Sequence, residues 1–267
     1  MKVVLMGTPD FVVPIFDEIA TRHDVVAVFT RAPKPAGRKH VITKSPVQAW
    51  AESHGFPVYH KLSEYNFHPD IVFVAAYGAI LRDNVLNSAP CINLHPSLLP
   101  LYRGPSPIRS AIKNGDKESG VCLIKMTDEL DAGDILMSRH FNIDIDDTNE
   151  SVEEKVSKIG ADMIIEYMNA PEKFIAKPQS GKIVYTAKTG VYDEIIDWKK
   201  SPMEIHNIVR AYGCGRTKIN GIDVKILKTK MNGDRLEIIT VQPAGRRPMD
   251  WKSFVNGLHG AEIVYGE

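Results

Sequence analysis

Three cysteines in 267 residues are too few, and too irregularly spaced, for a disulfide framework or a zinc site. An odd number without Cys-x-x-Cys spacing suits a reducing compartment, and we expect Cys91, Cys122 and Cys214 to be small buried apolar residues. No apolar run approaches the roughly eighteen residues of a membrane span. Residues 1–6 lack the residue order of a signal peptide. We therefore expect a cytoplasmic protein without a membrane segment.

The chain also lacks the glycine motifs of nucleotide-binding folds. Neither G-x-G-x-x-G nor G-x-x-x-x-G-K-[ST] occurs, so binding of a dinucleotide or nucleoside triphosphate has no support. Net charge is zero, but the segment from Lys177 to the end holds 15 Lys or Arg against 10 Asp or Glu. This asymmetry is a modest indication that the tail meets a polyanion, although on charge alone a mixed charged surface is the slightly better explanation.

Apolar runs alternate with helical patterns in the first part of the chain. Continuous apolar runs are typical of buried parallel strands, so the pattern predicts an α/β, Rossmann-like domain with a mostly parallel sheet. Ser45 is a predicted helix N-cap, with Pro46 in the first turn and Gly55 as the stop signal. The predicted strands are Lys2–Met6, Val25–Phe29, Pro57–His60, Ile71–Ala76 and Cys91–Leu94, and the predicted helices are Val13–Thr21, Ser45–His54 and Ile80–Asn87.

Farther along, Val121–Met126 and Ile135–Ile143 are predicted to form a β-pair around an acidic loop. A helix capped by Asn149 or Ser151 then extends to Met168, with a core-facing apolar stripe. Pro178 and Gly181 indicate a linker. We predict domains at residues 1–176 and 191–267, joined by a linker at 177–190.

The last segment has the pattern of a small β domain. It combines a predicted helix, Pro202–Tyr212, with short strands at Asp223–Lys228 and Arg235–Val241, and Asn232-Gly233 between the strands is a hairpin signal. Several short strands in such a length of chain suit a small barrel.

Asn93 and His95 form the first candidate catalytic pair. Residues two apart on a strand point to one face, so both side chains leave the end of the strand together, where α/β sheets bind ligands. An amide N–H can stabilise an oxyanion, an imidazole can carry a proton, and a carboxylate such as Asp131 can orient the imidazole and favour its charge. Asp128, Glu129 and Asp134 compete for the carboxylate role. Taken as a bare pair, Asn93 and His95 also fit an ordinary hydrogen-bonded turn.

The residues around this pair carry a family resemblance. With Tyr102-Arg103-Gly104, Pro105–Pro107 and Met126–Asp134, the segment resembles the folate-dependent formyltransferases. Further matches narrow the resemblance to the members that formylate methionyl-tRNA. They are Met6–Phe11, Lys34–Arg38, Asp197-Trp198-Lys199, Ile205-His206-Asn207 and Val209-Arg210-Ala211, in collinear order over nearly the whole chain.

The resemblance implies a reaction. The amino group of initiator methionyl-tRNA attacks the formyl carbon of 10-formyltetrahydrofolate, Asn93 and protonated His95 support the oxyanion, and Asp131 positions His95. Either His95 or an ordered water removes the amine proton. No metal is implied. The family's second domain is an OB-like barrel that binds tRNA, which agrees with the predicted C-terminal β domain.

The resemblance also implies two sets of binding residues. Composition alone makes Ala75–Leu81 a strand end and helix start, whereas the family places this segment in the pterin pocket. The folate contacts are Tyr77, Gly78, Ile80, Ser97, Leu98, Leu99, Pro100, Asp128 and Leu130. The stretch Thr30–Lys44 is basic, has no acid, and contains prolines that we expect to prevent regular structure, so it suits a mobile loop that contacts phosphates. The tRNA contacts are Lys34, Arg38, Lys39, Arg246 and Arg247, with Arg38 the strongest candidate.

Three alternatives stay open at this point. The chain is shorter than the tRNA enzymes usually are, so an amino sugar linked to a nucleotide is a rival acceptor. A non-catalytic RNA-binding relative would not need Asn93, His95 and Asp131. A formyltetrahydrofolate hydrolase would carry a further regulatory domain, which we do not expect ahead of the strand that starts at residue 2. The oligomeric state is open, with a monomer as the expectation.

Overall fold

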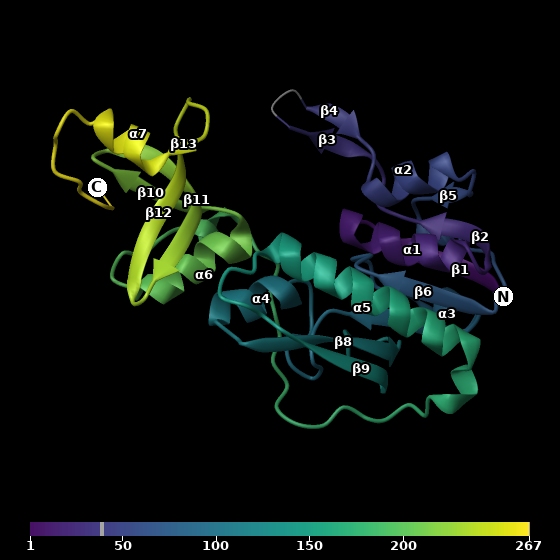
Figure 1. Ribbon diagram of the computed structural model, residues 1–267. Helices are drawn as coiled ribbons and strands as arrows, with labels where there is room; N and C mark the ends of the chain where they lie inside the picture. The colour runs from purple at the N-terminus through teal and green to yellow at the C-terminus, as the bar shows by residue number, and fades with distance from the viewer. Residues whose placement is uncertain (38–39, 267) are drawn as a thin grey trace. The chain divides into compact units, whose positions relative to one another are not determined.

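The computed structural model describes residues 1–37 and 40–266, and the chain forms two compact units (Figure 1). Unit 1 consists of Met1–Pro105, Gly120–Phe141 and Glu153–Tyr185. Unit 2 consists of Ser106–Ser119, Asn142–Val152 and the chain from Thr186 onwards. Each unit thus gathers separate segments of the sequence. The domain boundaries expected at 176 and 190 stay a prediction.

A central sheet forms the core of unit 1. Its strands are β1 (Lys2–Gly7), β2 (Asp24–Phe29), β5 (Val58–Tyr59), β6 (Ile71–Ala75), β7 (Cys91–His95), β8 (Glu118–Lys125) and β9 (Ile135–Asn142). Among the described residues they lie in the order β5-β2-β1-β6-β7-β8-β9. The pairs from β5 to β7 are parallel, and β8 joins β7 antiparallel. The prediction of an α/β fold with a mostly parallel sheet is confirmed.

The helices that accompany this sheet begin largely where the sequence predicts. They are α1 (Val13–Ala20), α2 (Pro46–Ser53), α3 (Asp83–Leu86) and α5 (Asn149–Asn169), with short 3₁₀ turns η1 (Asp10–Val12), η2 (Leu62–Glu64) and η3 (Pro171–Lys173). At α2 the predicted cap is confirmed, because the Ser45 hydroxyl accepts a hydrogen bond from the Gln48 N–H at 3.0 Å. Gly55 after this helix has φ +73°, which glycine adopts without strain.

Two helix starts differ from the prediction. Helix α3 begins at Asp83 rather than Ile80, and Leu81 before it is buried in the cluster that includes Val4 and Val74. Helix α5 is capped by Thr148, not by Asn149 or Ser151. The Thr148 hydroxyl accepts from the Ser151 N–H at 3.3 Å, and the Ser151 hydroxyl accepts from the Thr148 N–H at 3.0 Å.

The expectation that Thr30–Lys44 lacks regular structure is wrong. Strands β3 (Lys34–Ala36) and β4 (Val41–Thr43) pair antiparallel in a two-stranded hairpin. Pro35 is tolerated there because an isolated ribbon has an outer edge on which no N–H is required. The hairpin exposes apolar side chains, since Val41 and Ile42 are 58% and 64% exposed.

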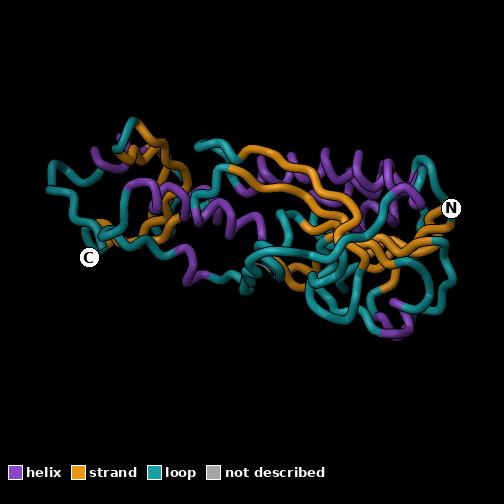
Figure 2. Tube along the Cα trace, turned by 90° about the horizontal axis from the view of Figure 1, so that it is seen from below, coloured by secondary structure: helices purple, strands orange, loops and turns teal. Residues whose placement is uncertain are grey.

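The two faces of the unit 1 sheet have different roles. On one face Leu94 of β7 meets α1 and α5, where a Cβ at Gly160 would lie 2.3 Å from Leu94 and 3.2 Å from Ile15. Glycine at position 160 therefore allows α5 to lie close against the strand. Figure 2 shows the long helices on one side of the strands and mainly loops on the other. The opposite face carries a second buried cluster that includes Val4, Met6, Val72, Val74 and Cys91.

Unit 2 is built on a small antiparallel sheet. Its strands are β10 (Gly215–Ile219), β11 (Ile222–Asn232), β12 (Arg235–Pro243) and β13 (Met249–Asp250), in that spatial order within the part of the chain that the structure describes. The hairpin predicted at Asn232-Gly233 is confirmed by the pairing of Asn232 with Arg235. The predicted small C-terminal β domain is confirmed as this sheet, and closure into a barrel stays a prediction.

Helices complete unit 2. They are α4 (Pro107–Asn114), α6 (Pro202–Tyr212) and α7 (Trp251–Asn256), with a 3₁₀ turn η4 (Val191–Glu194). Helix α4 packs on α6, and α6 packs on β11. Ile205 and Val209 of α6 join Val224 and Ile226 of β11 in a buried apolar cluster. Of the helices within residues 1–37 and 40–266, none has both the length and the hydropathy of a bilayer-spanning segment.

Candidate active site

Strand β7 presents Asn93 and His95 on one face of the unit 1 sheet. Side chains alternate along a strand, so both point away from Leu94 and toward the face that carries the second buried cluster. Their exposed fractions are 8% and 4%. The pair therefore lies under the loops that cover this face, at the carboxyl end of the strand.

Asp131 joins this pair from the loop between β8 and β9. Its Oδ1 lies 3.4 Å from Asn93 Nδ2, and its Oδ2 lies 3.6 Å from His95 Nδ1. The Gly104 N–H donates to the same Oδ2 at 2.8 Å. Asp131 has φ +48°, a conformation that non-glycine residues rarely adopt and that commonly marks functional sites. The structure therefore brings Asn93, His95 and Asp131 together, whereas Asp128 and Glu129 are exposed to solvent.

The loop that carries Asp131 doubles back closely on β8. The Lys125 N–H donates to the Asp134 carbonyl at 2.9 Å. A Cβ at Gly133 would lie 1.8 Å from the Lys125 carbonyl oxygen, so this turn requires glycine. This tight turn holds the Asp131 backbone close to the end of β8, from which its side chain extends to Asn93 and His95 of β7.

Both ring nitrogens of His95 face hydrogen-bond acceptors. Nε2 lies 2.9 Å from the Tyr102 carbonyl oxygen, so Nε2 carries a proton and donates it. Nδ1 faces Asp131 at a distance too long for a hydrogen bond, as expected when Nδ1 holds a lone pair. Burial lowers the pKa of His95, while the Asp131 carboxylate and the Tyr102 carbonyl act to raise it and Arg103 acts to lower it. The direction of this pKa shift favours the neutral imidazole, whereas the resemblance implies a protonated one.

Gln179 is a residue of this site that the sequence did not reveal. Its Nε2 donates to the carbonyl oxygens of Asp131 and Gly133, each at 2.8 Å. Its Oε1 accepts from Arg103, at 3.0 Å from Nε and 2.7 Å from Nη2. The sequence offered no signal for this role, because a single glutamine between Pro178 and Gly181 has the pattern of a linker.

The residues expected to bind folate fall into two groups by exposure. Tyr77 is half-buried and packs, together with Met126, on the cluster beneath Asn93 and His95, and burial raises the pKa of Tyr77. Ile80 and Leu130 instead expose 74% and 55% of their surface. Gly78 and Asp128 are also exposed.

The segment from Ser97 to Pro100 is mostly packed inside unit 1. The Ser97 hydroxyl donates to the Leu101 carbonyl at 2.6 Å, so it stabilises the turn rather than facing solvent. Leu99 packs with Cys122 and Ile124 of β8. Leu98 is half-buried and Pro100 is buried. This segment offers mainly backbone and apolar surface to a ligand.

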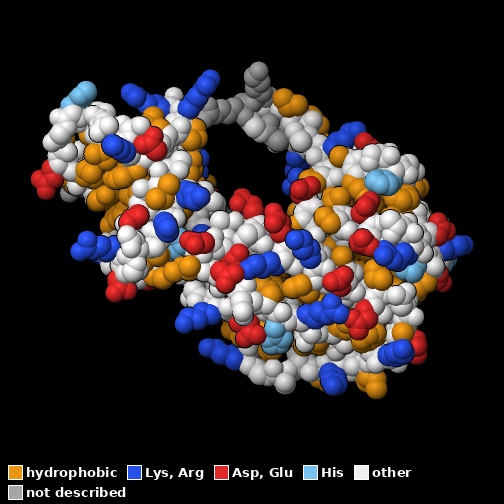
Figure 3. Space-filling model, viewed as in Figure 1, with side chains coloured by type: hydrophobic (Ala, Val, Ile, Leu, Met, Phe, Trp, Pro, Cys, Tyr) orange, Lys and Arg blue, Asp and Glu red, His pale blue; other side chains and the backbone are white. Residues whose placement is uncertain are grey.

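The expected tRNA contacts are distributed over both units. Lys34 is exposed on β3 in unit 1, and Arg246 and Arg247 are exposed between β12 and β13 in unit 2. Arg38 and Lys39 lie outside the described residues. Figure 3 shows basic and acidic side chains interspersed over the visible face rather than separated by sign.

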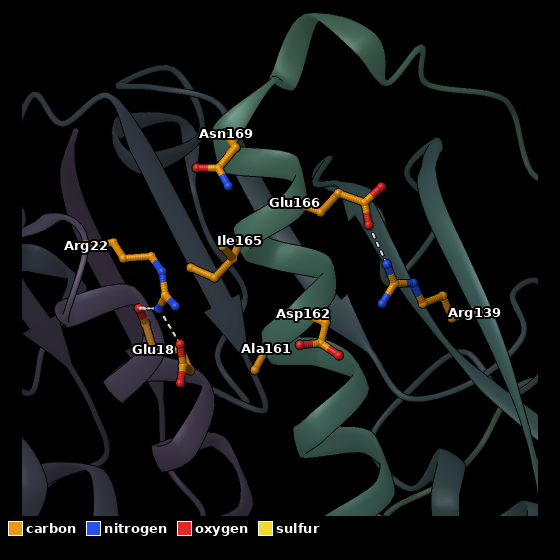
Figure 4. Close-up of a pocket in the computed structure, with 8 residues that line it drawn as sticks. All are labelled: Glu18, Arg22, Arg139, Ala161, Asp162, Ile165, Glu166 and Asn169. Carbon is orange, nitrogen blue, oxygen red and sulfur yellow. Dashed lines mark hydrogen bonds and ion pairs between the residues drawn. The ribbon is translucent and has the colours of Figure 1, made fainter.

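A separate surface pocket lies among α1, α5 and β9 (Figure 4). Two ion pairs line it, Arg22 with Glu18 and Arg139 with Glu166, and Asp162 adds a further acid. The paired side chains are well exposed, and none of Asn93, His95 and Asp131 lines this pocket. The pocket is therefore not the candidate active site.

The cysteines behave as expected. All three are buried and unpaired, and burial raises the pKa of Cys91 to about 12 and that of Cys122 to about 11. Such thiols stay protonated and unreactive at neutral pH. Within residues 1–37 and 40–266, no three or more His, Cys, Asp or Glu side chains gather as a metal site.

The sequence and the fold correspond to a known family. The model of the formyl transferase family matches residues 1–168, and the chain belongs to this family of formyl-transferring enzymes. A methionyl-tRNA formyltransferase from Jannaschia sp. is 34% identical over 300 aligned residues that cover 100% of this chain and 99% of that protein. The family resemblance of the sequence is thereby confirmed.

Solved structures share the fold. The N-formyltransferase from Helicobacter canadensis, in complex with folinic acid and dTDP-3-aminofucose, has a TM-score of 0.69 and 22% identity, and the match covers 87% of this chain and 88% of that one. The methionyl-tRNA formyltransferase from Clostridium thermocellum has a TM-score of 0.66 and 17% identity, with coverage of 91% and 98%. At these identities the likeness shows the fold alone.

Proposed function

We propose that this protein transfers the formyl group of 10-formyltetrahydrofolate to the amino group of initiator methionyl-tRNA. The observation that carries the proposal is the assembly of Asn93, His95 and Asp131 at the carboxyl end of β7. Near-complete coverage of relatives named methionyl-tRNA formyltransferases supports the choice of acceptor. The expected cytoplasmic location and monomeric state are part of the same proposal.

The chemistry is a direct acyl transfer. The unprotonated methionyl amine attacks the formyl carbon, a C–N bond forms, and the carbonyl oxygen becomes a tetrahedral oxyanion. Asn93 donates an amide N–H to that oxyanion. This donor is preorganised, because Asp131 holds the Asn93 amide in place. When the intermediate collapses, the bond between the formyl carbon and N10 of folate breaks. The proton lost by the amine ends on N10, so the products are formyl-methionyl-tRNA and tetrahydrofolate.

His95 is suited to carry that proton. Its lowered pKa keeps the resting ring neutral, and Nδ1 holds a lone pair. Protonation at Nδ1, directly or through a water, creates an imidazolium that faces the Asp131 carboxylate and donates through Nε2 to Tyr102. The positive charge then supports the oxyanion. The same contacts with Asp131 and Tyr102 thus accommodate the His95 ring both in its neutral resting form and in its protonated form during the reaction.

The folate contacts are the segments that surround this strand end. We assign the pterin to the exposed apolar side chains of Ile80 and Leu130 and to Tyr77, because a flat ring gains from burial of such surface. The backbone of the packed turn from residue 97 to 100 borders the same strand end. The complete set is Tyr77, Gly78, Ile80, Ser97, Leu98, Leu99, Pro100, Asp128 and Leu130.

For tRNA we assign phosphate contacts to the β3–β4 hairpin and to the turn between β12 and β13. The side chains are Lys34, Arg38, Lys39, Arg246 and Arg247. Such contacts give affinity without reading sequence. The C-terminal domain, residues 191–267, is then a tRNA-binding module joined to the catalytic domain, residues 1–176.

The first experiment measures formyl transfer from 10-formyltetrahydrofolate to charged initiator methionyl-tRNA, beside a panel of nucleotide-linked amino sugars. Formyl-methionyl-tRNA is the expected product. Transfer only to an amino sugar would keep the catalytic trio and overturn the acceptor. Transfer to neither, in protein shown to be folded, would favour the non-catalytic RNA-binding relative.

The RNA contacts are tested separately. Arg246→Ala with Arg247→Ala should raise the KM for tRNA severalfold and reduce the salt dependence of tRNA binding by about two charges, one for each lost phosphate contact. Arg38→Ala should also raise this KM. In each variant the KM for folate should match the wild type. Lys252→Ala is the matched control, because Lys252 is also an exposed cation of the C-terminal domain. An unchanged KM for tRNA would remove the tested residues from the RNA site.

A further inference from the structure

The segment predicted as a linker crosses the candidate active site. The Ile135 and Lys177 backbones exchange hydrogen bonds of 2.8 and 2.9 Å, and farther on the Arg103 N–H donates to the Val184 carbonyl at 2.8 Å. Between these two attachments lies Gln179, which is partly buried. We call residues 177–184 the strap. It is attached at both ends to segments that carry site residues.

Gln179 uses both ends of its amide. The donor end meets the carbonyl oxygens of Asp131 and Gly133, and the acceptor end meets the Arg103 guanidinium. Arg103 is buried, with 7% of its surface exposed, so its charge needs polar partners. A side-chain carboxamide is well suited to link two carbonyl acceptors to a cationic donor, because it carries both a donor and an acceptor on one rigid group.

This link acts on a residue with a left-handed backbone conformation. Asp131 has φ +48°, and its side chain must keep three contacts at once, with Asn93, His95 and the Gly104 N–H. An unfavourable backbone conformation persists only where neighbouring contacts hold it. The two hydrogen bonds from Gln179 hold the carbonyls on either side of Ala132, and thereby the turn that presents the carboxylate.

We propose that Gln179 is a positioning residue for catalysis, which holds the Asp131 carboxylate against Asn93 and His95 and ties that geometry to docking of the strap. The inference rests on the proposed function, since it assigns Gln179 to the same reaction. Gln179 touches no reacting atom. Its loss misplaces Asp131, and small misplacements of catalytic groups reduce turnover strongly.

The test compares the pKa of His95, measured by NMR on ¹⁵N-labelled imidazoles, in the wild type, Gln179→Met, Asp131→Asn and the double variant. The charged and titratable groups around His95 are Asp131, Arg103 and, on the facing strand, Cys122. Asp131 raises the pKa of His95, so Gln179→Met should lower it in the same direction as Asp131→Asn. Ser180→Ala, at an exposed neighbouring position of the strap, is the control and should leave it unchanged.

The double variant separates positioning from general loosening. If Gln179 acts through Asp131, adding Gln179→Met to Asp131→Asn should give no further shift. A His95 pKa equal to that of the wild type in Gln179→Met, or shifts that simply add in the double variant, would overturn the proposal. This readout needs no acceptor substrate, so it stands even if formyl transfer to methionyl-tRNA is not observed.

If Gln179→Met does not fold, a second variant tests the same role. Gln179→Glu keeps a partner for Arg103 but offers no donor to the carbonyls of Asp131 and Gly133. We expect kcat to fall roughly tenfold to a hundredfold, with the KM for folate unchanged, because the contact acts on the catalytic geometry rather than on substrate binding. A kcat equal to that of the wild type would contradict the positioning role.

Discussion

His95 in unit 1 and His206 in unit 2 are buried to nearly the same extent, with exposed fractions of 4% and 3%. In both, burial lowers the pKa. Their partners differ. His206 Nε2 lies 2.9 Å from the Ile145 carbonyl, and Nδ1 lies 2.8 Å from the Thr229 hydroxyl. A neutral imidazole satisfies both contacts, donating through Nε2 and accepting the hydroxyl proton at Nδ1.

His95 is not satisfied in this way. Its Nε2 also donates to a carbonyl, but its Nδ1 faces a carboxylate, which has no proton to offer. The neutral ring therefore keeps an unmatched lone pair, and a proton at Nδ1 would improve the local contacts. Burial alone does not distinguish a structural histidine from a candidate catalytic one. The chemistry of the second partner does, because a carboxylate favours the charged form and a hydroxyl accommodates the neutral one.

The largest expected difference between the two histidines is in turnover. His95→Ala should reduce kcat by roughly a hundredfold or more, as expected for the loss of a proton-transfer group, whereas His206→Ala should leave kcat per folded molecule near that of the wild type. Both are measured by steady-state formyl transfer after the folded fraction has been determined. His68→Ala, at an exposed histidine, is the control. Near-full turnover in His95→Ala would remove His95 from the mechanism.

Asp131→Asn sharpens the comparison, because it gives His95 a neutral partner like that of His206. We expect kcat to fall by about tenfold to a hundredfold. The sign of the pH effect follows from the electrostatics. Asp131 raises the pKa of His95, so its neutralisation lowers that pKa and shifts the acidic limb of the kcat profile to lower pH. A limb shifted to higher pH, or not shifted, would contradict a role for His95 as the proton acceptor.

The sequence was sufficient for the parts of the site that follow from strand periodicity. Alternation along Cys91–Leu94 predicted that Asn93 and His95 share a face, and apolar runs predicted the parallel sheet that presents them. The hairpin at Lys34–Ala36 and Val41–Thr43 does not follow from the sequence, because Pro33, Pro35 and Gly37 are typical of irregular structure, although edge positions tolerate proline.

Contacts between distant segments were beyond the sequence. Gln179 meets Asp131 across 48 residues and Arg103 across 76, and no local period encodes such pairs. Helix α4 was not predicted, although Pro107 at its first position is favourable there. Its packing on α6 places it in the same compact unit as the C-terminal sheet. Local sequence propensity predicts single helices and strands. The contacts of Gln179 and the packing of α4 on α6 depend instead on which surfaces meet after folding.

For stability, in contrast to turnover, we expect the larger loss on substitution of His206. His206→Ala leaves the Thr229 hydroxyl and the Ile145 carbonyl without their partner in a buried setting. We expect the free energy of unfolding to fall by about 1–3 kcal/mol, the cost of unsatisfied buried polar groups. Urea unfolding followed by circular dichroism measures it, with His68→Ala at an exposed position as the control. An unchanged midpoint would show that unit 2 does not depend on this contact.

The smallest effect is the pH dependence of stability near neutrality. The pKa of His206 is lowered in the folded state from its ordinary value of 6.5, so its contribution to stability is complete above that pH. As the pH falls below it, the unfolded chain binds protons first and folding becomes less favourable. His95 and His23, whose pKa values are also lowered, add to the same trend. One such group contributes at most about 1.4 kcal/mol per pH unit.

Urea unfolding at pH values from about 6.5 down to about 5.5 tests this trend, because most carboxylates remain ionised in that window. His206→Gln removes one titrating group while keeping a side chain that can still reach polar partners. Its unfolding free energy should therefore depend less steeply on pH than that of the wild type, whatever its stability at pH 7. If the unfolding free energy depends equally on pH in the two proteins, protonation of His206 does not disrupt its contacts with Ile145 and Thr229. The contrast with His95 would then rest on turnover alone.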